Sequence, residues 1–278
     1  MKSVGEILNA SAEFLERKKI DRPKRLAEEL LAHALRVKRI DLYMQFDRLV
    51  EESELSQMRP WIKRLSEGEP IEYIIGEVDF FGCKIKVDPR VLIPRPETEI
   101  LIDHIAKRLK NASSVWDICT GSGCIGIALK KKFPLISVSL ADLSSDALAL
   151  ASENAVLNGV TVECLLGDLL EPFSGKKTDA IVVNPPYVSA SEYLSLDPSV
   201  RNFEPKMALV GGDKGTEFYE RLEKSLPGFL NPGAQVFLEI GFAQGDALQT
   251  IFSSPVWSKR ECLPDWAGKD RFFFLEMQ

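Results

Sequence analysis

The chain has 278 residues, of which 45% are hydrophobic and 27% are charged, and its formal net charge is −6. This composition is typical of a globular protein, and the length allows one large domain or two ordinary ones with ample core. No apolar stretch resembles a secretory signal or approaches the roughly 20 residues of a membrane span, so we expect a cytoplasmic protein.

The cysteines and histidines argue against metal and disulfide chemistry. The five cysteines are an odd number, are scattered and have no C-x-x-C spacing. The two histidines, His33 and His104, are far apart in the sequence. We therefore expect a reducing compartment, no disulfide framework and no metal site.

Residues 1–68 are expected to form a small helical bundle. Ser3 and Glu6 match a capping box at the start of a first helix, and Pro23 suits the first turn of a second. A third helix is expected from Glu54 to Glu67, with a kink at Pro60. This segment carries no catalytic motif of its own.

Residues 69–95 are expected to form a β-hairpin connector. Short runs of β-type residues at 71–75, 78–81 and 84–87 are separated by glycines and follow a boundary at Gly68-Glu69-Pro70. An amphipathic helix is predicted next, because apolar residues recur at helical spacing from Ile100 onward. Three charged residues precede Ile100, and these are Arg95, Glu97 and Glu99. Their charges either suit the dipole at the start of this helix or line a site.

The remainder, residues 96–278, has the alternating pattern of an open α/β sheet. Apolar strands are predicted near 114–118, 136–141, 161–166, 179–183 and 234–240, and helices near 124–132, 145–158, 215–230 and 243–252. Two final strands, 256–263 and 271–276, have no helix between them. We therefore predict a mostly parallel sheet of seven strands whose edge is an antiparallel hairpin.

A glycine-rich loop at residues 117–126 follows the first strand of this sheet and opens a helix. Gly121, Gly123 and Gly126 match the G-x-G-x-x-G pattern of cofactor loops. Glycines that merely pack a helix on a strand would give the same pattern. The order of strand, loop and helix favours a cofactor site.

Three acidic residues at strand ends help to choose the cofactor. Asp142 ends the second strand and can accept from ribose hydroxyls, and Asp168, with Leu169, can meet an adenine amine and ring. Asp117 lies inside the loop, where its charge would oppose a pyrophosphate but would favour a ligand ammonium. The pattern therefore favours S-adenosylmethionine over a nicotinamide dinucleotide.

Asn184-Pro185-Pro186-Tyr187 follows the apolar strand at 180–183. The two prolines end the strand and donate no backbone N–H, so their carbonyls can point into a site. Together with the amide of Asn184 and the ring of Tyr187, they suit a planar group that carries an –NH2, such as an amide or a nucleobase. An ordinary proline-rich turn would have a similar sequence.

These segments together resemble the class I S-adenosylmethionine-dependent methyltransferases, which have a Rossmann-like sheet with a C-terminal hairpin. Within that class, the chain is similar to the bacterial release-factor glutamine methyltransferases, the HemK/PrmC family. The resemblance covers nearly the whole chain, and its segments are the helical N-terminal domain and residues 93–99, 117–126, 184–187, 203–205, 208–209, 215 and 265–271. The Asn-Pro-Pro-Tyr motif alone is shared with nucleic-acid enzymes, and its combination with Arg-Pro-Glu-Thr-Glu is more specific.

The resemblance implies that the chain methylates the side-chain nitrogen of the glutamine in the Gly-Gly-Gln motif of peptide-chain release factors. Asn184, Pro185 and Tyr187 are expected to be catalytic, because an amide oxygen, a backbone carbonyl and an aromatic ring can orient the substrate amide, and Pro186 completes the substrate pocket. The expected cofactor contacts are Asp117, Cys119, Thr120, Gly121, Ser122, Gly123, Asp142, Asp168, Leu169 and Asn184. Cys119 stands where the family usually has its first loop glycine, and its side chain is expected to be tolerated if φ is negative.

The charge distribution bears on the rival hypothesis, a nucleic-acid adenine-N6 or guanine-N2 methyltransferase that binds a flipped base. Residues 69–278 hold 21 Lys and Arg against 29 Asp and Glu, which disfavours tight nucleic-acid binding. Residues 1–68 hold 14 against 12, and their basic clusters form either a solvated helix face or a contact surface. We expect a monomer that recognises the release factor through residues 1–68, without stable binding to nucleic acid or membrane.

Overall fold

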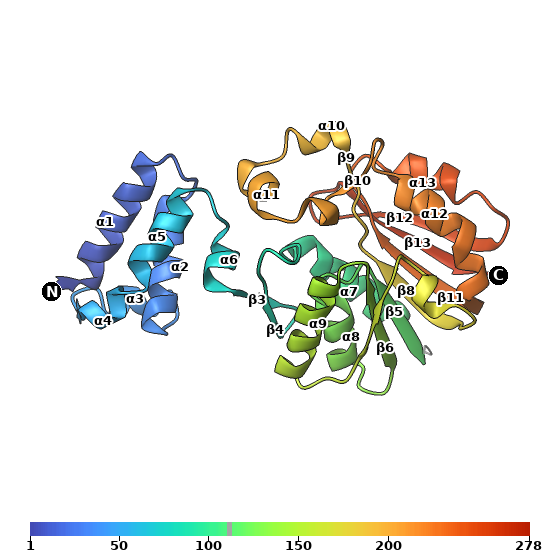
Figure 1. The fold of residues 1–278 in the computed structure, drawn as a ribbon, viewed down its shortest axis with the longest axis horizontal. Coiled ribbons are helices and arrows are strands. Elements are labelled where there is room, and N and C mark those ends of the chain that lie inside the picture. The colour runs from blue at the N-terminus through green and yellow to red at the C-terminus, as the bar shows by residue number, and fades with distance from the viewer. Residues whose placement is uncertain (110–112) are drawn as a thin grey trace. The chain divides into compact units, whose positions relative to one another are not determined.

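A computed structural model of the protein describes residues 1–109 and 113–278 (Figure 1). The described chain forms two compact units, residues 1–76 with 198–203 and residues 77–197 with 204–278. None of the helices in these described residues is both long and apolar enough to cross a membrane. Each unit has its own elements and its own core.

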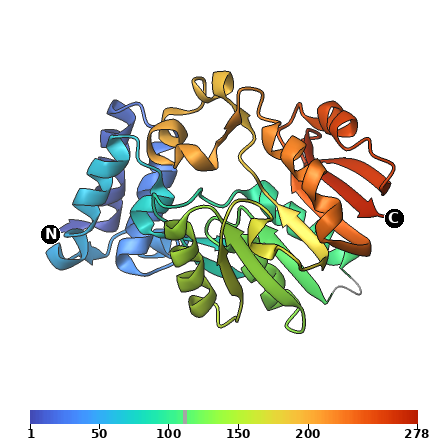
Figure 2. The same cartoon turned by 45° about the vertical axis from the view of Figure 1, so that its right-hand side comes forward.

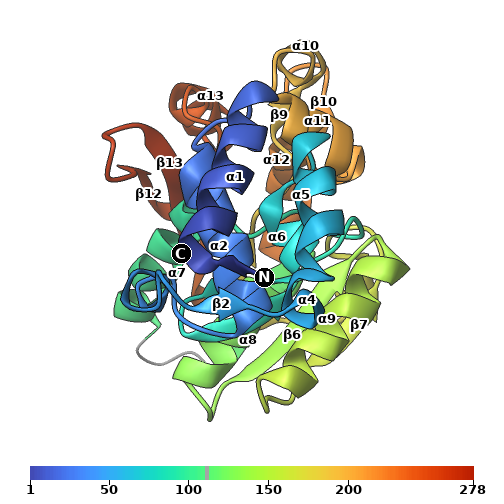
Figure 3. The same cartoon turned by 90° about the vertical axis from the view of Figure 1, so that its left-hand side faces the viewer.

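The first unit is a helical bundle, whose helices α1, α2 and α5 are labelled in Figure 3. Its helices α1, α2 and α5 contact one another in pairs. Ser3 caps α1 through the predicted capping box with Glu6, and Pro23 occupies the first turn of α2, so both expected helix starts are confirmed. The elements are β1 (Lys2–Ser3), α1 (Val4–Arg17), α2 (Pro23–Leu35), α3 (Asp41–Met44), β2 (Leu49–Val50), α4 (Glu52–Leu55), α5 (Met58–Ser66), α6 (Ile71–Ile75) and α11 (Pro198–Phe203).

Two sequence-based expectations in this unit are wrong. The run at 71–75 is the helix α6, not a strand, because Ile71 and Ile74 lie one helical turn apart and are both buried in the core of the bundle. Gly76 ends this helix in the left-handed conformation. The expected helix from Glu54 to Glu67 is two helices, α4 and α5, which are separated before Pro60. Pro60 then lies in the first turn of α5, where no backbone N–H is required.

The second unit begins with an antiparallel hairpin, β3 (Glu77–Phe80) and β4 (Cys83–Lys86), which confirms two of the three expected β runs. Both turn residues, Phe81 and Gly82, have positive φ, as a tight hairpin turn requires. Within the second unit, β4 contacts the helices α8 (Cys124–Lys132) and α9 (Ser145–Leu157).

The centre of the second unit is a sheet of seven strands in the order β12-β13-β11-β8-β5-β6-β7. The five strands from β11 to β7 are parallel, and β13 is antiparallel to both β11 and β12, as expected (Figure 2). The strands are β5 (Ser114–Ile118), β6 (Ser137–Asp142), β7 (Glu163–Leu166), β8 (Thr178–Val183), β11 (Leu230–Glu239), β12 (Trp257–Pro264) and β13 (Asp270–Met277).

Helices cover this sheet, and the packing follows the alternation of side chains along the strands. One face buries Ile118, Val183 and Leu238 against helices α12 (Glu217–Ser225) and α13 (Gly245–Ile251). Helix α7 (Pro96–Arg108) contacts α8 and β11, and α8 contacts β5 and β6. This is the layered arrangement that the alternating sequence pattern predicts.

The helix expected at 215–230 is shorter in the structure. α12 ends at Ser225, and the 3-10 turn η3 (Leu226–Phe229) contains Pro227, which cannot continue an α-helix. Between β8 and α12 lie short elements that the sequence pattern does not reveal. They are β9 (Val188–Ser189), α10 (Ala190–Tyr193), α11, η2 (Lys206–Ala208) and β10 (Val210–Gly212). One further 3-10 turn, η1 (Glu171–Phe173), lies between β7 and β8.

Candidate active site

The candidate site lies where the parallel strands end. Register pairs Val183 of β8 with Ile118 on one side and with Leu238 on the other. The next residues along these three strands are Asn184, Cys119 and Glu239. At the carboxyl edge of the sheet, Asn184 therefore lies between Cys119, which follows β5, and Glu239, which ends β11. Neighbouring strands lie about 4.8 Å apart. This edge is where open α/β sheets bind their ligands.

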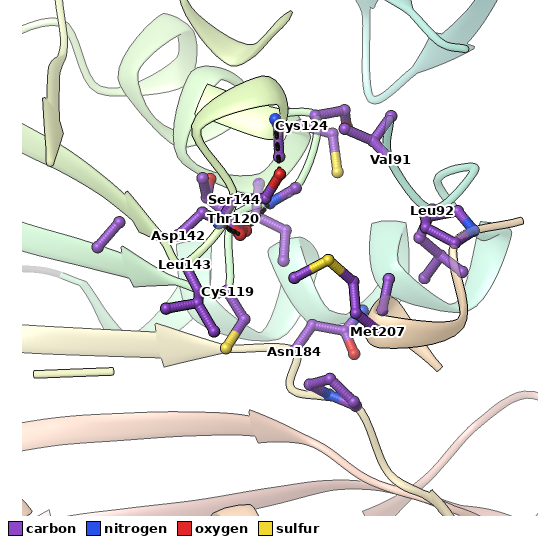
Figure 4. Close-up of a pocket in the computed structure, with 18 of the residues that line it drawn as sticks. Val91, Leu92, Cys119, Thr120, Cys124, Asp142, Leu143, Ser144, Asn184 and Met207 are labelled. Carbon is purple, nitrogen blue, oxygen red and sulfur yellow. Dashed lines mark hydrogen bonds between the residues drawn. The ribbon is translucent and has the colours of Figure 1, made fainter. Parts of the chain in front are cut away.

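A pocket at this edge brings together most of the predicted site residues (Figure 4). Cys119 lies between Asp142 and Asn184 in the close-up, in keeping with the strand order β6-β5-β8. The predicted residues that line the pocket are Cys119, Thr120, Gly121, Ser122, Asp142, Asp168, Leu169, Asn184 and Pro186. Four predicted residues do not line it, and these are Asp117, Gly123, Pro185 and Tyr187.

The glycine-rich loop is held open towards the pocket. The backbone N–H of Gly121 donates to Asp142 at 2.8 Å, which ties the loop to the end of β6. Gly121 has a φ of +53°, and a side chain added there would meet no atom within 4 Å. Glycine is therefore favoured by the backbone conformation, and the space above it is free for a ligand.

Cys119 adopts a conformation that the sequence did not predict. Its φ is +57°, in the left-handed region, so the condition under which a side chain would be tolerated without strain is not met. Its side chain packs against the core of the sheet, and burial raises the pKa of its thiol. Leu169 also lines the pocket with a positive φ of 49°. Two non-glycine residues are thus held in a costly conformation at one site.

Asp117 lies beneath the loop. Its side chain is fully buried, and one carboxylate oxygen accepts from the Thr120 hydroxyl at 2.6 Å and from the backbone N–H of Gly126 at 2.9 Å. The other oxygen has no hydrogen-bond partner among the described residues. Burial raises the pKa of Asp117 to about 7. Asp117 thus supports the loop from behind, and its contact with a ligand stays a prediction.

The other two acids do face the pocket. Asp142 accepts from the backbone N–H groups of Gly121 and Ser144, and burial raises its pKa. Each of its oxygens still has a lone pair for a ligand hydroxyl. Asp168 forms an ion pair with Arg221 at 2.6 Å, so one of its oxygens is engaged before any ligand binds.

The Asn-Pro-Pro-Tyr backbone is held tightly by the segments beside it. A side chain at Gly211 would approach the Pro186 carbonyl oxygen to 2.2 Å, so only glycine allows this contact. The Gln244 side chain donates to the Tyr187 carbonyl at 3.0 Å and to Gly215 at 3.1 Å. The motif is therefore rigid before any substrate binds.

The side chains of the motif differ in their freedom. The Tyr187 ring packs against the core of the sheet, and burial raises the pKa of its phenol. In contrast, the Asn184 side chain lines the pocket and makes no hydrogen bond with residues 1–109 or 113–278. Its amide is thus free to bind a ligand group.

Two buried carboxylates near the site were missed by the sequence-based interpretation. Glu204 accepts from the backbone N–H of Ile93 at 3.0 Å and from Arg95 at 2.5 Å, and this joins two segments of the pocket wall. Glu239 accepts from the Thr98 hydroxyl at 2.7 Å. A signal for Glu239 was present, because it ends an apolar strand just as Asp142 does.

Metal and disulfide chemistry find no support in the described residues. All five cysteines are free. In the part of the chain that the structure describes, no group of three or more His, Cys, Asp or Glu residues could hold a metal ion.

The fold and this edge site define the class as that of class I methyltransferases. A methyltransferase from Pyrococcus furiosus is similar with a TM-score of 0.54 and 19% identity, over 70% of this chain and 89% of that chain. A T. thermophilus 16S rRNA methyltransferase in complex with AdoMet and guanosine is similar with a TM-score of 0.52 and 15% identity, over 73% of this chain and 50% of that one. At these identities, the likeness shows the fold alone.

Sequence comparison identifies the family within this class. Residues 6–76 match the PrmC N-terminal domain, and residues 96–196 match the methyltransferase small domain. The chain is 41% identical to the release factor glutamine methyltransferase of Chlamydia trachomatis, over 98% of this chain and 94% of the relative. It is 37% identical to that of Bacillus cereus, over 99% of both. The chain belongs to the release factor glutamine methyltransferase family.

Proposed function

We propose that this protein transfers the methyl group of S-adenosylmethionine to the side-chain nitrogen of the glutamine in the Gly-Gly-Gln motif of peptide-chain release factors. The name of the relatives, release factor glutamine methyltransferase, supports a glutamine of a release factor as the methyl acceptor. These relatives align with nearly the whole chain. One structural observation carries the proposal: Asn184 presents an uncommitted amide to the pocket, directly beside the cofactor loop at Cys119.

The residues of the pocket fit S-adenosylmethionine. The open space above Gly121 suits the methionine end, and Asp142 has lone pairs for the ribose hydroxyls. Leu169 and Phe218 give apolar walls for an adenine ring, and Asp168 offers its free oxygen to the exocyclic amine. The bound molecule would supply an electrophilic methyl group on a sulfonium. We propose that the cofactor also contacts Cys119, Thr120, Ser122 and Gly123, and that Asp117 supports the loop from behind.

The protein's task is then to orient the acceptor. An amide nitrogen is a poor nucleophile, because its lone pair is delocalised into the carbonyl. We propose that the Asn184 side-chain oxygen accepts a hydrogen bond from one N–H of the substrate amide. The Pro185 carbonyl accepts a hydrogen bond from the other N–H. Two such acceptors fix the direction of the nitrogen lone pair and return electron density to it. Pro186, which lines the pocket, would provide a wall for the amide, and we propose that the Tyr187 ring supports this wall from the core of the sheet.

Residues 1–68 are proposed to recognise the body of the release factor. The helical unit has its own core, and it carries an excess of cations. The connector at 69–95 and the methyltransferase domain at 96–278 complete the proposed organisation.

Mass spectrometry of release factors from cells with and without this protein tests the proposal. We expect the Gly-Gly-Gln peptide to carry one added methyl group only when the protein is present. Labelled methyl transfer in a lysate, separated into protein and nucleic acid, tests the rival substrate. Label in nucleic acid and none on the glutamine would contradict the proposal and favour a base methyltransferase.

A further inference from the structure

Glu239 is a buried carboxylate at the end of β11, and it takes no part in the proposed orientation of the substrate amide. Its side chain is only 1% exposed. Register places it beside Asn184, because Leu238 and Val183 are paired on adjacent parallel strands. It is thus one strand away from the proposed acceptor site, whereas Asp142 is two strands away on the other side.

Thr98 connects Glu239 to the pocket. It lies in the first turn of α7, lines the same pocket as Asn184 and Pro186, and is 2% exposed. Its hydroxyl donates to Glu239 Oε2 at 2.7 Å. A hydroxyl can accept one proton while it donates another, so Thr98 can pass a proton from the pocket to the carboxylate.

The surroundings of Glu239 set its proton affinity. Burial raises its pKa to about 7, while the Thr98 hydrogen bond and the charge of Arg271 act in the opposite direction. Glu97 raises the pKa further, and Arg95 lowers it. Burial raises the pKa of Tyr187, Tyr219 and Cys124, and the negative charge of Glu239 raises the pKa of these three groups further.

The proposed reaction needs a proton acceptor. When an amide nitrogen forms a bond to a methyl carbon, it carries one proton too many, and that proton is lost. The Asn184 amide and the proline carbonyls are very weak bases. The acids that line the pocket among the described residues are Asp142, which ends β6, and Asp168, which follows β7, and both strands are more distant from Asn184 than β11 is.

We propose that Glu239, acting through Thr98, receives the proton that the substrate amide releases on methylation. This inference rests on the proposed function. The amide nitrogen forms a bond to the methyl carbon of the sulfonium donor, and the electron pair of the broken carbon–sulfur bond stays on sulfur. The nitrogen proton passes to the Thr98 oxygen, and the Thr98 proton passes to Glu239. The products are a secondary amide, a neutral thioether and a neutral carboxylic acid, which later loses its proton to water.

The test is the pH dependence of turnover with a Gly-Gly-Gln peptide and saturating S-adenosylmethionine. Because the acceptor must be ionised, wild-type turnover should fall as the pH drops below about 7. Glu239→Gln should lower turnover about a hundredfold at pH 8, the typical size of a proton-transfer contribution, and should remove the acidic limb. Thr98→Val should behave similarly, and Thr98→Ser should restore both rate and limb.

Two measurements separate this role from a structural one. Thermal unfolding and the dissociation constant of S-adenosylhomocysteine should stay close to wild type in Glu239→Gln. In protein labelled with carbon-13 at the glutamate carboxyls, one signal should titrate near pH 7 and should be missing from Glu239→Gln. Absence of such a signal from the wild-type spectrum would contradict the inference without any assay of activity.

The outcomes distinguish this inference from the proposed function. If wild type methylates the glutamine and Glu239→Gln keeps its rate and its acidic limb, the inference is wrong and the proposed function stands. If wild type does not methylate the glutamine, the proposed function is wrong and the inference falls with it.

Discussion

Asn184 is the residue on which the proposed chemistry depends most directly. Its amide faces the pocket without a hydrogen bond to any described residue. We expect Asn184→Ala to lower turnover at least a hundredfold, because one of the two groups that orient the substrate amide is lost. The fold should be unchanged, since no internal bond is broken.

A matched variant completes this prediction. Asp142→Ala should weaken the binding of S-adenosylmethionine, whereas Asn184→Ala should leave it largely intact, as measured by calorimetry. Methyl transfer by Asn184→Ala at the wild-type rate would contradict the assigned role. An unchanged dissociation constant in Asp142→Ala would remove Asp142 from the cofactor site.

Cys119 allows a test of backbone strain at the same site. Its φ of +57° is costly for any residue with a Cβ atom. Cys119→Ala and Cys119→Gly both remove the sulfur, but only glycine removes the strain. We therefore expect the glycine variant to be more stable than the alanine variant by about 1 kcal/mol. At a residue with negative φ the order would be reversed, so a more stable alanine variant in urea unfolding would disprove the strained conformation.

At the scale of elements, one side chain holds the amino ends of three strands together. Asp179 in β8 accepts from Ser113 and Ser114 at the start of β5 and from Asn231 in β11. Burial alone would raise the pKa of Asp179, but the hydrogen bonds from Ser113, Asn231 and Ser114 outweigh it and lower the pKa to about 2.

This network predicts a specific dependence of stability on pH. A carboxyl whose pKa is lowered from 3.8 to about 2 stabilises the fold above pH 4. By linkage the contribution is at most about 2 kcal/mol, and it is lost as the pH falls from 4 to 2. Asp179→Asn should lack this loss and should be less stable at pH 7. Asp103→Asn, an exposed acid on α7, is the control and should follow wild type in urea unfolding at each pH.

The elements differ in how far the sequence could predict them. The strand β8 ends in a continuous apolar run, and β5 and β6 are short segments in which apolar residues predominate between polar ends, so pattern and length sufficed. The sequence of the helix α6 predicts a strand equally well, because five residues rich in isoleucine fit either structure and only their packing decides between the two.

The candidate site shows the same limit. Asp142, Asn184 and the glycine loop could be predicted, because each chemistry-bearing residue directly follows a recognisable strand. The pair of Thr98 and Glu239 could not, because 141 positions separate the two residues and only the sheet register brings them together. The positive φ of Cys119 was hidden for a related reason, since the sequence gives no measure of the strain that a packed loop can hold.

At the scale of the whole molecule, the helical unit carries an exposed surface of unusual composition. Five large apolar side chains between residues 40 and 49 are exposed. Lys38 and Arg39 precede them in the sequence, and Arg48 lies among them. The five are Ile40, Tyr43, Met44, Phe46 and Leu49. Exposed apolar groups that gather on one short segment often mark a protein-binding surface. If residues 1–68 recognise the release factor, this segment is the first place to test.

We expect the double substitution Ile40→Asp and Met44→Asp to lower kcat/KM for an intact release factor about tenfold, since about 1.4 kcal/mol of apolar contact would be lost. Methylation of a short Gly-Gly-Gln peptide should not change, because the peptide has no body to dock. Val156→Asp is the matched control, since Val156 on α9 is 79% exposed and Met44 is 82% exposed. Equal losses on both substrates would assign residues 40–49 to folding. No loss on either would place recognition of the release factor elsewhere on the protein.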